Sequence, residues 1–463
     1  MDASVASIGD GDTIAAIATA SGIGGVGIVR LSGPRAIELV AQTLGLAPDA
    51  LTREVRVGWA RSRTGERLDH VLAFAMRAPA SFTGEDVAEL HGHGGTHNLN
   101  ALLSSVVERG ARIAEPGEFT RRAVANGKLD LARAEALLDV IHAGSERALR
   151  LARANLGGAL GEQAQRHERR ALALLAELEG RIDFPEEDMP DADTAWIASE
   201  IEALRSACAA LADGFRHGRA ISAGITVALV GPVNVGKSSL LNALVGTERA
   251  LVAAEPGTTR DWLEVSDVWN GVAVTLIDTA GIRPTENAIE ARGIELGAQR
   301  VESADVVVVV NDGVGPWDDG ARYGARAVVV RSKADLADGE RTSQPGGRSA
   351  TASGERTPNA PIYTSAKSAQ GLDELRARVL AVAGVADREG AEQAFVTTAR
   401  QQAVAASARD AFAAAGVAWA AKRPPEIIAV ELRAGAQALA QLRGIEVGER
   451  VLDEVFARFC IGK

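Results

Sequence analysis

The sequence has 463 residues and a net charge of −11, which argues against a broad nucleic-acid-binding surface, so any RNA contact needs a local patch or a partner. Its length suggests about three domains, and its two cysteines argue against a disulfide framework and for a reducing compartment. We expect a soluble, cytoplasmic protein, because the sequence shows no basic and apolar N-terminal signal and no apolar run of about 18 residues.

The first region, residues 1–126, opens with two predicted strands. Residues 12–19 are largely apolar, and residues 22–27 satisfy the pattern G-x-G-x-x-G. A dinucleotide-binding fold would need a helix directly after this pattern. Residues 28–33 are instead β-branched, short and followed by proline. We therefore expect a glycine hairpin that presents Arg30 on a second strand.

Three histidines lie further along this region, after an acidic turn and a short predicted strand: His91, His93 and His97. They suggest a metal site, but the sequence offers no evident fourth ligand. We expect the histidines beside the glycines to lie in a turn and to satisfy backbone groups. A metal site is the alternative.

Long helices are predicted on both sides of the central region. From about residue 128 to residue 221 the sequence is rich in Ala, Leu, Arg and Glu, and Leu174, Leu175 and Leu178 form one apolar face. A second helical block spans about 390–463. We expect the region between the blocks to be inserted into a helical bundle built from both flanks, so that its motions can reach helices on either side.

Residues 231–239 contain the phosphate-binding pattern G-x-x-x-x-G-K-S, which ends at Ser238. An apolar run precedes them and a helical pattern follows, which is the strand, loop and helix context that the pattern requires. In such a loop backbone N–H groups surround a phosphate, Lys237 reaches the outer phosphates and the Ser238 hydroxyl ligates magnesium. The pattern predicts a nucleotide site.

Two further motifs are typical of a nucleotide switch. Thr259, beside Thr258, is placed to supply a second magnesium hydroxyl. The D-T-A-G motif at 278–281 follows a predicted strand, where its aspartate can hold hydrated magnesium and its glycine N–H can bond the γ-phosphate. The valine run at 306–310 predicts a strand of a parallel sheet covered on both faces.

The base is predicted from the S-K-A-D motif at 332–335, which resembles the guanine-reading N-K-x-D signature of GTPases. Asp335 would accept two hydrogen bonds that guanine donates and adenine does not. We expect Ser332, in place of the usual asparagine, to loosen the loops around the base more than it changes specificity. The predicted GTP-binding residues are Asn234, Val235, Gly236, Lys237, Ser238, Ser239, Ala253, Ala254, Glu255, Pro256, Gly257, Thr258, Thr259, Asp278, Thr279, Ala280, Gly281, Ser332, Lys333, Asp335, Ser365, Ala366 and Lys367.

Motifs along nearly the whole chain resemble the MnmE (TrmE) family of tRNA-modification GTPases. They include D-T-I-A-A-I-A-T, G-G-V-G-I-V-R, S-F-T-G-E-D-V, E-P-G-E-F-T-R-R-A, N-G-K-L-D-L, P-G-T-T-R-D, D-T-A-G and the terminal F-C-I-G-K. The resemblance implies a homodimer formed by the N-terminal domain and a complex with a FAD protein of the MnmG type, through which tRNA is bound. It also implies addition of an aminomethyl or carboxymethylaminomethyl group at carbon five of the wobble uridine of certain tRNAs.

The resemblance further implies a site for 5-formyltetrahydrofolate or a related one-carbon tetrahydrofolate. Its residues would be Arg30, Glu89, Lys128 and the terminal Lys463. Arginine and lysine can pair with the folate carboxylates, and a glutamate can accept hydrogen bonds from the pterin N–H groups. For the tail thiol, Cys460, the resemblance implies a catalytic role in the modification.

GTP hydrolysis is implied to differ from that of Ras-like proteins, because Ile282 occupies the position of their water-orienting glutamine. Glu290 would orient the water, and a potassium ion would stabilise the charge that develops on the phosphate oxygens. The potassium ligands would come from Asn234, Ala253, Glu255 and Thr258, and the magnesium ligands from Ser238 and Thr259.

The sequence therefore predicts a multidomain α/β plus α protein. Its parts are an N-terminal α+β folate-binding and dimerisation domain (1–126), a first helical part (127–221), an inserted Ras-like P-loop GTPase domain (222–388) and a second helical part with the cysteine tail (389–463). Two other functions stay open. A ribosome-assembly switch would be favoured by an RNA-binding domain after the GTPase domain, and a membrane or transport GTPase would need apolar or lipidated segments.

Overall fold

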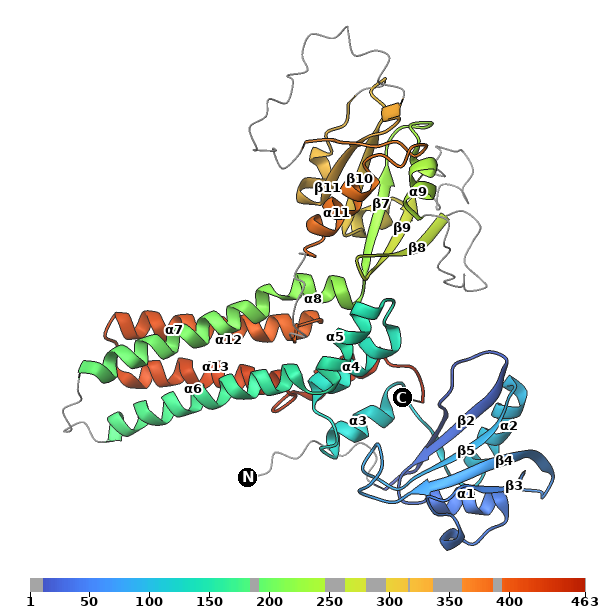
Figure 1. Ribbon diagram of the computed structural model, residues 1–463. Coiled ribbons are helices and arrows are strands. Elements are labelled where there is room, and N and C mark those ends of the chain that lie inside the picture. Colours follow the sequence, from blue (N-terminus) through green and yellow to red (C-terminus); the bar gives the residue numbers. More distant parts are fainter. Residues whose placement is uncertain are drawn as a thin grey trace, which may run out of the picture. The chain divides into compact units, whose positions relative to one another are not determined.

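The computed structural model shown in Figure 1 describes most of the chain, namely residues 11–183, 191–245, 263–279, 297–314, 317–335, 360–385 and 394–462. The chain divides into two compact units. One comprises Met1–Leu138, Gly161–Leu172 and Ala436–Lys463, and the other comprises Asp139–Leu160 and Ala173–Gly435. Within the described ranges, every helix is too short or too polar to cross a membrane.

The N-terminal region contains a six-stranded sheet in the order β3-β4-β5-β2-β1-β6. Only the β1–β6 pair is parallel. The strands are β1 (Ile14–Ile17), β2 (Gly24–Ser32), β3 (Arg56–Arg61), β4 (Arg67–Met76), β5 (Val87–Gly94) and β6 (Arg112–Ile113). Helices α1 (Ala36–Leu44) and α2 (Thr96–Val107) bury their apolar faces against the sheet, and η1 (Pro48–Ala50) precedes β3.

The glycine hairpin predicted near the N-terminus is confirmed. β1 pairs with β2 in antiparallel register, with Ile17 opposite Val29, and β2 begins within the glycine-rich segment. A strand, not the helix of a dinucleotide-binding fold, therefore follows the G-x-G-x-x-G pattern. Gly33 ends the hairpin with φ of 127°, and a Cβ atom there would lie 2.5 Å from the Asp12 carbonyl oxygen.

Helices lie on both sides of the inserted region in the sequence. They are α3 (Glu118–Ala125), α4 (Leu131–His142), α5 (Glu146–Leu156), α6 (Ala159–Asp183), α7 (Asp191–Asp213), α8 (Phe215–Ser222), α12 (Ala399–Ala420), α13 (Pro425–Leu442) and α14 (Glu449–Phe456). Figure 1 shows α7 lying along α12, two helices that are far apart in sequence. The Thr398 side chain closes a capping box at the start of α12.

The inserted region holds a second six-stranded sheet in the order β12-β11-β10-β7-β9-β8, in which only the β8–β9 pair is antiparallel. The strands are β7 (Ile225–Val230), β8 (Leu263–Trp269), β9 (Val272–Asp278), β10 (Val306–Asn311), β11 (Ala327–Arg331) and β12 (Ile362–Tyr363). Its helices include α9 (Lys237–Val245) and α11 (Leu372–Val382), and η2 (Ala321–Arg326) precedes β11. The predicted α/β plus α fold class is confirmed.

The valine run of β10 is buried along its whole length. Val306, Val308 and Val310 pack into the same core as the apolar side chains of α9 and α11. Val307 and Val309 pack into a second core on the opposite face. Because successive strand residues point to opposite faces, this division explains why an unbroken apolar run was required.

Candidate functional site

The loop between β7 and α9 has a backbone shape that its residue types allow. Gly231 and Gly236 have φ of 147° and 103°, values that side chains with a Cβ atom rarely adopt. A Cβ atom on Gly231 would also lie 2.3 Å from the Val310 carbonyl oxygen. Asn234 has φ of 62°, a left-handed conformation in which asparagine is enriched. The phosphate-binding pattern therefore reflects real backbone constraints at both glycines.

Lys237 and Ser238 begin helix α9 beside the end of β9. Lys237 is buried and donates hydrogen bonds of 2.8 Å to the carbonyl oxygens of Gly231 and Pro232. Burial lowers the pKa of Lys237, against the opposing effect of the Asp278 carboxylate. Ser238 Oγ donates a hydrogen bond of 2.6 Å to Asp278 Oδ2. The structure thus gathers an ammonium, a hydroxyl and a carboxylate, and the two oxygens are ligand types that suit Mg²⁺.

Thr279 follows Asp278 and connects β9 to its neighbour β7. Its hydroxyl donates a hydrogen bond of 2.6 Å to the Leu229 carbonyl oxygen. Ser239, the residue after the loop pattern, lies exposed in the first turn of α9.

Segments that follow β11 and β12 meet at the carboxyl edge of the same sheet. Ser365 Oγ donates a hydrogen bond of 2.8 Å to Asp335 Oδ1, and the Ala334 N–H donates to the Thr364 carbonyl oxygen at 3.0 Å. Asp335 is thereby oriented by a neighbouring loop. Ala366 and Lys367 continue that loop with exposed side chains.

Ser332 makes contacts that sequence analysis did not foresee. We expected a serine here to loosen the loops, but its hydroxyl donates a hydrogen bond of 2.6 Å to the Val235 carbonyl oxygen of the phosphate-binding loop. The Ser332 side chain is buried, and its Oγ also lies 3.2 Å from the Asn311 carbonyl oxygen. The serine therefore connects the two loops directly.

Lys333 makes a second connection to the phosphate-binding loop. Its ammonium lies 3.0 Å from the Asn234 carbonyl oxygen and 3.2 Å from Asp312 Oδ2. The aliphatic stem of Lys333 therefore spans from the segment after β11 to the loop after β7.

In the N-terminal region, Arg30 and Glu89 face one another across β2 and β5. Arg30 Nε donates a hydrogen bond of 2.7 Å to Glu89 Oε1, and His91 Nε2 lies 2.7 Å from Glu89 Oε2. Burial alone would raise the pKa of Glu89, but the hydrogen bonds from His91 and Arg30 outweigh burial and lower it. Glu89 is therefore an ionised carboxylate whose two oxygens already have protein partners.

Lys128, the third predicted folate residue, contacts the turn that precedes β5. Its ammonium donates a hydrogen bond of 3.0 Å to the Pro79 carbonyl oxygen. Gly84 in the same turn has φ of 81°, and a Cβ atom there would lie 3.2 Å from Lys128 Cγ. Asn126 Nδ2 also bonds this turn, at the Thr83 carbonyl oxygen. Lys128 is thus held by this turn.

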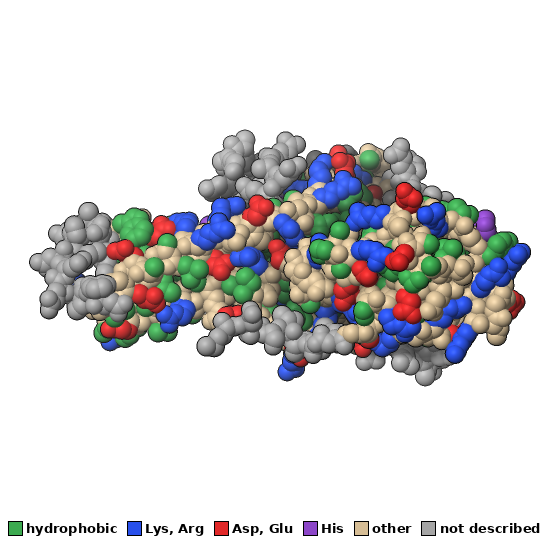
Figure 2. Space-filling view, turned by 90° about the horizontal axis from the view of Figure 1, so that it is seen from below, with side chains coloured by type: hydrophobic (Ala, Val, Ile, Leu, Met, Phe, Trp, Pro, Cys, Tyr) green, Lys and Arg blue, Asp and Glu red, His purple; other side chains and the backbone are tan. Residues whose placement is uncertain are grey.

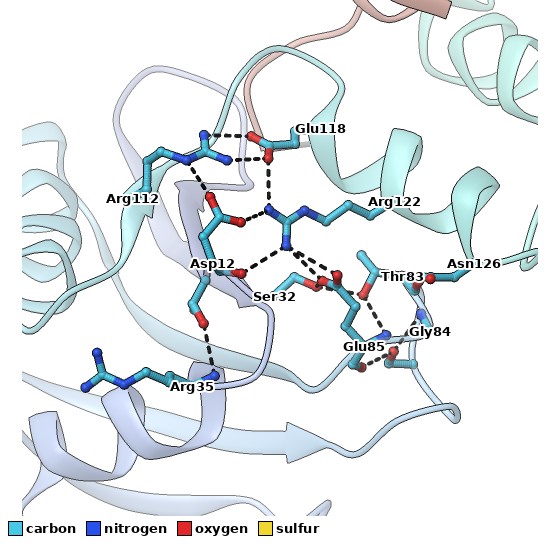
Figure 3. Close-up of polar contacts among 12 residues, drawn as sticks. Asp12, Ser32, Arg35, Thr83, Gly84, Glu85, Arg112, Glu118, Arg122 and Asn126 are labelled. Atoms are coloured by element: carbon cyan, nitrogen blue, oxygen red, sulfur yellow. Dashed lines mark hydrogen bonds and ion pairs between the residues drawn. The ribbon is translucent and has the colours of Figure 1, made fainter. Parts of the chain in front are cut away.

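An ion-pair network that sequence analysis missed connects this turn to α3 (Figure 3). Arg122, 4% exposed, donates through Nη2 to Asp12 Oδ1 at 2.6 Å and to Glu118 Oε1 at 3.0 Å. Its Nη1 lies 3.2 Å from Glu85 Oε2. Arg112 bonds Glu118 Oε1 at 2.6 Å and Asp12 Oδ2 at 2.7 Å. Arg122 therefore links three segments that are distant in sequence.

The pKa values of two carboxyl groups in this network, Glu118 and Asp12, are lowered. Burial would raise the pKa of Glu118, but the hydrogen bonds from Arg112, the Glu115 N–H and Arg122 outweigh it and lower the pKa. The pKa of Asp12 is lowered in the same way, against its burial, by Arg112 and Arg122. These carboxylates stay ionised around neutral pH and keep both guanidinium groups paired.

The histidines correct one sequence expectation. His91 and His93 lie in strand β5, not in a turn, and their side chains bond carboxylates, not backbone groups. His91 pairs with Glu89, whereas His93 Nδ1 lies 2.7 Å from Asp69 Oδ1. Within the part of the chain that the structure describes, no cluster of His, Cys, Asp and Glu could hold a metal ion.

The C-terminal tail places Cys460 at the surface beside the N-terminal region. The Gly117 N–H donates to the Cys460 carbonyl oxygen at 3.4 Å, and Ile461 forms a β-bridge with Pro116. The Cys460 side chain is exposed. By contrast Cys208 is buried, and burial raises the pKa of its thiol to about 12.

Several predicted site residues lie outside the described residues. They are Ala253, Ala254, Glu255, Pro256, Gly257, Thr258, Thr259, Ala280, Gly281, Glu290 and Lys463.

Where side chains are described, the face drawn in Figure 2 carries Lys and Arg interspersed with Asp and Glu.

Two family profiles match the sequence. The MnmE helical domain matches residues 131–460, and the GTP-binding protein TrmE N-terminus matches residues 13–128. The tRNA modification GTPase MnmE of Symbiobacterium thermophilum is 40% identical over 479 residues, which cover 98% of this chain and 99% of the relative. The protein of the same name from Synechococcus sp. (strain CC9605) is 41% identical over 465 residues, which cover 98% of this chain and 99% of the relative.

One solved structure with a similar region is the G domain of the T. maritima FeoB iron transporter. It is 25% identical, and the match covers 34% of this chain and 98% of that structure with a TM-score of 0.24.

Proposed function

Because this chain belongs to the MnmE family of tRNA-modification GTPases, we propose that it binds and hydrolyses GTP as part of the modification of tRNA. The observation that carries the proposal is the grouping of Lys237, Ser238 and Asp278 at one edge of the parallel sheet, with Asp335 oriented at the same edge. The relatives are named for tRNA modification, which favours this function over a ribosome-assembly switch.

The phosphate end of the nucleotide would bind at the start of α9. The Lys237 ammonium would pair with the outer phosphate oxygens. Its hydrogen bonds to the carbonyl oxygens of Gly231 and Pro232 already hold it at the loop. Ser238 and Thr259 would hold magnesium, with Asp278 behind its water shell. When bound, magnesium supplies charge neutralisation at the phosphate oxygens. The hydroxyl and carboxylate oxygens fit this ion because Mg²⁺ prefers oxygen ligands.

The guanine end would be selected by Asp335. Its carboxylate is oriented by Ser365 Oγ through a 2.8 Å hydrogen bond, so it can accept from the guanine edge without first being ordered. Charge-assisted hydrogen bonds of this kind contribute about 1.5–3 kcal/mol each, which is enough to favour GTP over ATP.

For hydrolysis we propose that a potassium ion binds near Asn234, with Ala253, Glu255 and Thr258 as its further ligands. A cation there would stabilise the negative charge that develops on the phosphate oxygens, and Glu290 would orient the attacking water. Support comes from Asn234, which is exposed and fixed in a left-handed conformation at the loop. Turnover of GTP that is equal in sodium and potassium would contradict this part of the proposal.

The N-terminal region would bind a one-carbon tetrahydrofolate such as 5-formyltetrahydrofolate through Arg30, Glu89, Lys128 and Lys463. The close Arg30–Glu89 pair supports this proposal, because it presents an ionised carboxylate for pterin N–H groups beside a cation. Isothermal titration with 5-formyltetrahydrofolate tests the site. Glu89→Gln would weaken the binding by at least about tenfold, as expected for loss of a charged hydrogen bond.

We further propose a homodimer formed by the N-terminal domain and a complex with a MnmG-type FAD protein. That complex would modify carbon five of the wobble uridine of certain tRNAs, with Cys460 as the catalytic thiol. The exposed position of Cys460 supports this role. We retain the domain division at 1–126, 127–221, 222–388 and 389–463 as part of the proposal.

The direct test of the nucleotide site uses the purified full-length chain with magnesium and potassium. Phosphate release from GTP, and much slower release from ATP, is the expected result. Lys237→Ala should abolish most of the turnover, and Lys422→Ala serves as a control, since Lys422 is exposed beyond the end of α12. Equal hydrolysis of GTP and ATP would contradict the proposed specificity.

A further inference from the structure

Two adjacent residues join the base-reading segment to consecutive carbonyls of the phosphate-binding loop. Ser332 Oγ donates to the Val235 carbonyl oxygen at 2.6 Å, and Lys333 Nζ donates to the Asn234 carbonyl oxygen at 3.0 Å. The two loops are 99 positions apart between Asn234 and Lys333. The backbone pairing of β7, β10 and β11 brings both loops to one edge of the sheet, and these two side chains add direct contacts between them.

Ser332 is itself firmly placed. Its backbone N–H donates to the Asn311 carbonyl oxygen at 2.7 Å, at the end of β10. Its side chain is buried, and a Cβ atom on Gly236 would lie 3.8 Å from Ser332 Oγ. Because the Ser332 side chain is buried, water has little access to its hydroxyl between the end of β10 and the phosphate-binding loop.

We propose that Ser332 is a positioning residue for guanine nucleotides, whose hydroxyl fixes the phosphate-binding loop relative to the segment that carries Asp335. The inference rests on the proposed GTP function. Ser332 acts through Val235 and contacts neither the predicted base-reading carboxylate nor the Lys237 ammonium. A nucleotide spans both loops, so loops that are already fixed bind it at a lower entropic cost.

This role predicts a particular pattern of binding effects. Loss of the hydroxyl should weaken every nucleotide that spans both loops by a similar factor, because the base contacts of Asp335 are unchanged. Loss of the Ser365 hydroxyl should instead change the preference among bases, because Ser365 bonds Asp335 itself. Ser303 offers a matched control, since its hydroxyl bonds the Arg300 carbonyl oxygen at the exposed surface.

The test is the dissociation rate of fluorescent GDP and of fluorescent xanthosine diphosphate (XDP), measured by stopped flow on the full-length chain. We expect Ser332→Ala to release GDP about tenfold faster, equivalent to about 1.4 kcal/mol, with an unchanged GDP to XDP preference. Ser332→Thr keeps a hydroxyl donor and should restore the rate to within about twofold. Ser303→Ala should match the wild type, and Ser365→Ala should alter the preference.

A wild-type GDP release rate in Ser332→Ala would overturn the inference. An equal loss in Ser332→Ala and Ser332→Thr would also overturn it, since packing and not the hydroxyl would then be responsible. A wild-type chain that binds no guanine nucleotide would contradict the proposed function itself, which distinguishes the two failures.

Discussion

The Ser238 hydroxyl donates a 2.6 Å hydrogen bond to Asp278 Oδ2, across the start of α9 and the end of β9. The two residues are brought together because β7 and β9 are parallel neighbours, so the loop after β7 and the end of β9 share one edge of the sheet. Loop residues placed at the carboxyl edge of a parallel sheet form the usual ligand site of such folds.

Removing the Ser238 hydroxyl should lower the rate constant for GTP hydrolysis in magnesium by about 100-fold, the size typical of a lost transition-state contact. Asp278 would then lose its hydrogen bond from Ser238, and magnesium would lose a proposed ligand. Phosphate release at saturating GTP measures the effect for Ser238→Ala. Ser303→Ala is the control, and wild-type turnover by Ser238→Ala at low magnesium would contradict the assignment.

Asp335→Asn should shift the nucleotide preference from GTP toward xanthosine triphosphate. An amide can donate to the oxygen that xanthine carries where guanine has an amino group, whereas a carboxylate only accepts. Competition of both triphosphates against fluorescent GDP measures the change. An unaltered preference for GTP would show that Asp335 does not contact the base.

The sheet and the phosphate-binding loop could be predicted because their signals are local. The valine run of β10 and the two glycines at 231 and 236 are dictated by burial and backbone conformation at those positions. The partners of Arg122 could not be predicted, because Asp12 and Glu85 lie 110 and 37 positions away. The periodicity of the sequence does not predict such long-range pairings. The tie from Ser332 to Val235 was missed for the same reason.

Acidic pH should destabilise α3. The folded-state pKa of Glu118 lies below its ordinary value of 4.5, so its ionised form stabilises the fold fully above that value. This stabilisation is lost as the pH falls through the lower, folded-state pKa. As the pH falls below 4.5, hydrogen exchange of the α3 amides should therefore accelerate relative to the intrinsic exchange rate. Unchanged protection of α3 at pH 3 would contradict this view.

Breaking the same network at neutral pH should have a larger effect. Arg122→Met removes the buried Arg122–Glu118 ion pair and the contacts of Arg122 to Asp12 and Glu85. Loss of one partner of a buried ion pair typically costs about 3–5 kcal/mol, so α3 should lose much of its exchange protection. Arg35→Met is the control, because Arg35 pairs with Glu38 at the exposed surface. Similar protection of α3 in the two variants would mean that the network contributes little to stability.

The two cysteines should differ strongly in reactivity. The exposed Cys460 should react with a thiol reagent such as DTNB within minutes at pH 8, whereas Cys208 should react only after unfolding because it is buried with a raised pKa. Absorbance should report one fast equivalent in the wild type. Cys460→Ser should remove it and Cys208→Ser should not. Two fast equivalents would contradict the burial of Cys208.

The central claim is that GTP hydrolysis by this chain serves tRNA modification. It is tested most directly by mass spectrometry of tRNA nucleosides from cells that lack the gene, complemented with the wild type or with Lys237→Ala. We expect the modified wobble uridine to disappear without the gene, to return with the wild type and to stay absent with Lys237→Ala. Intact wobble-uridine modification in cells that lack the gene would contradict the account.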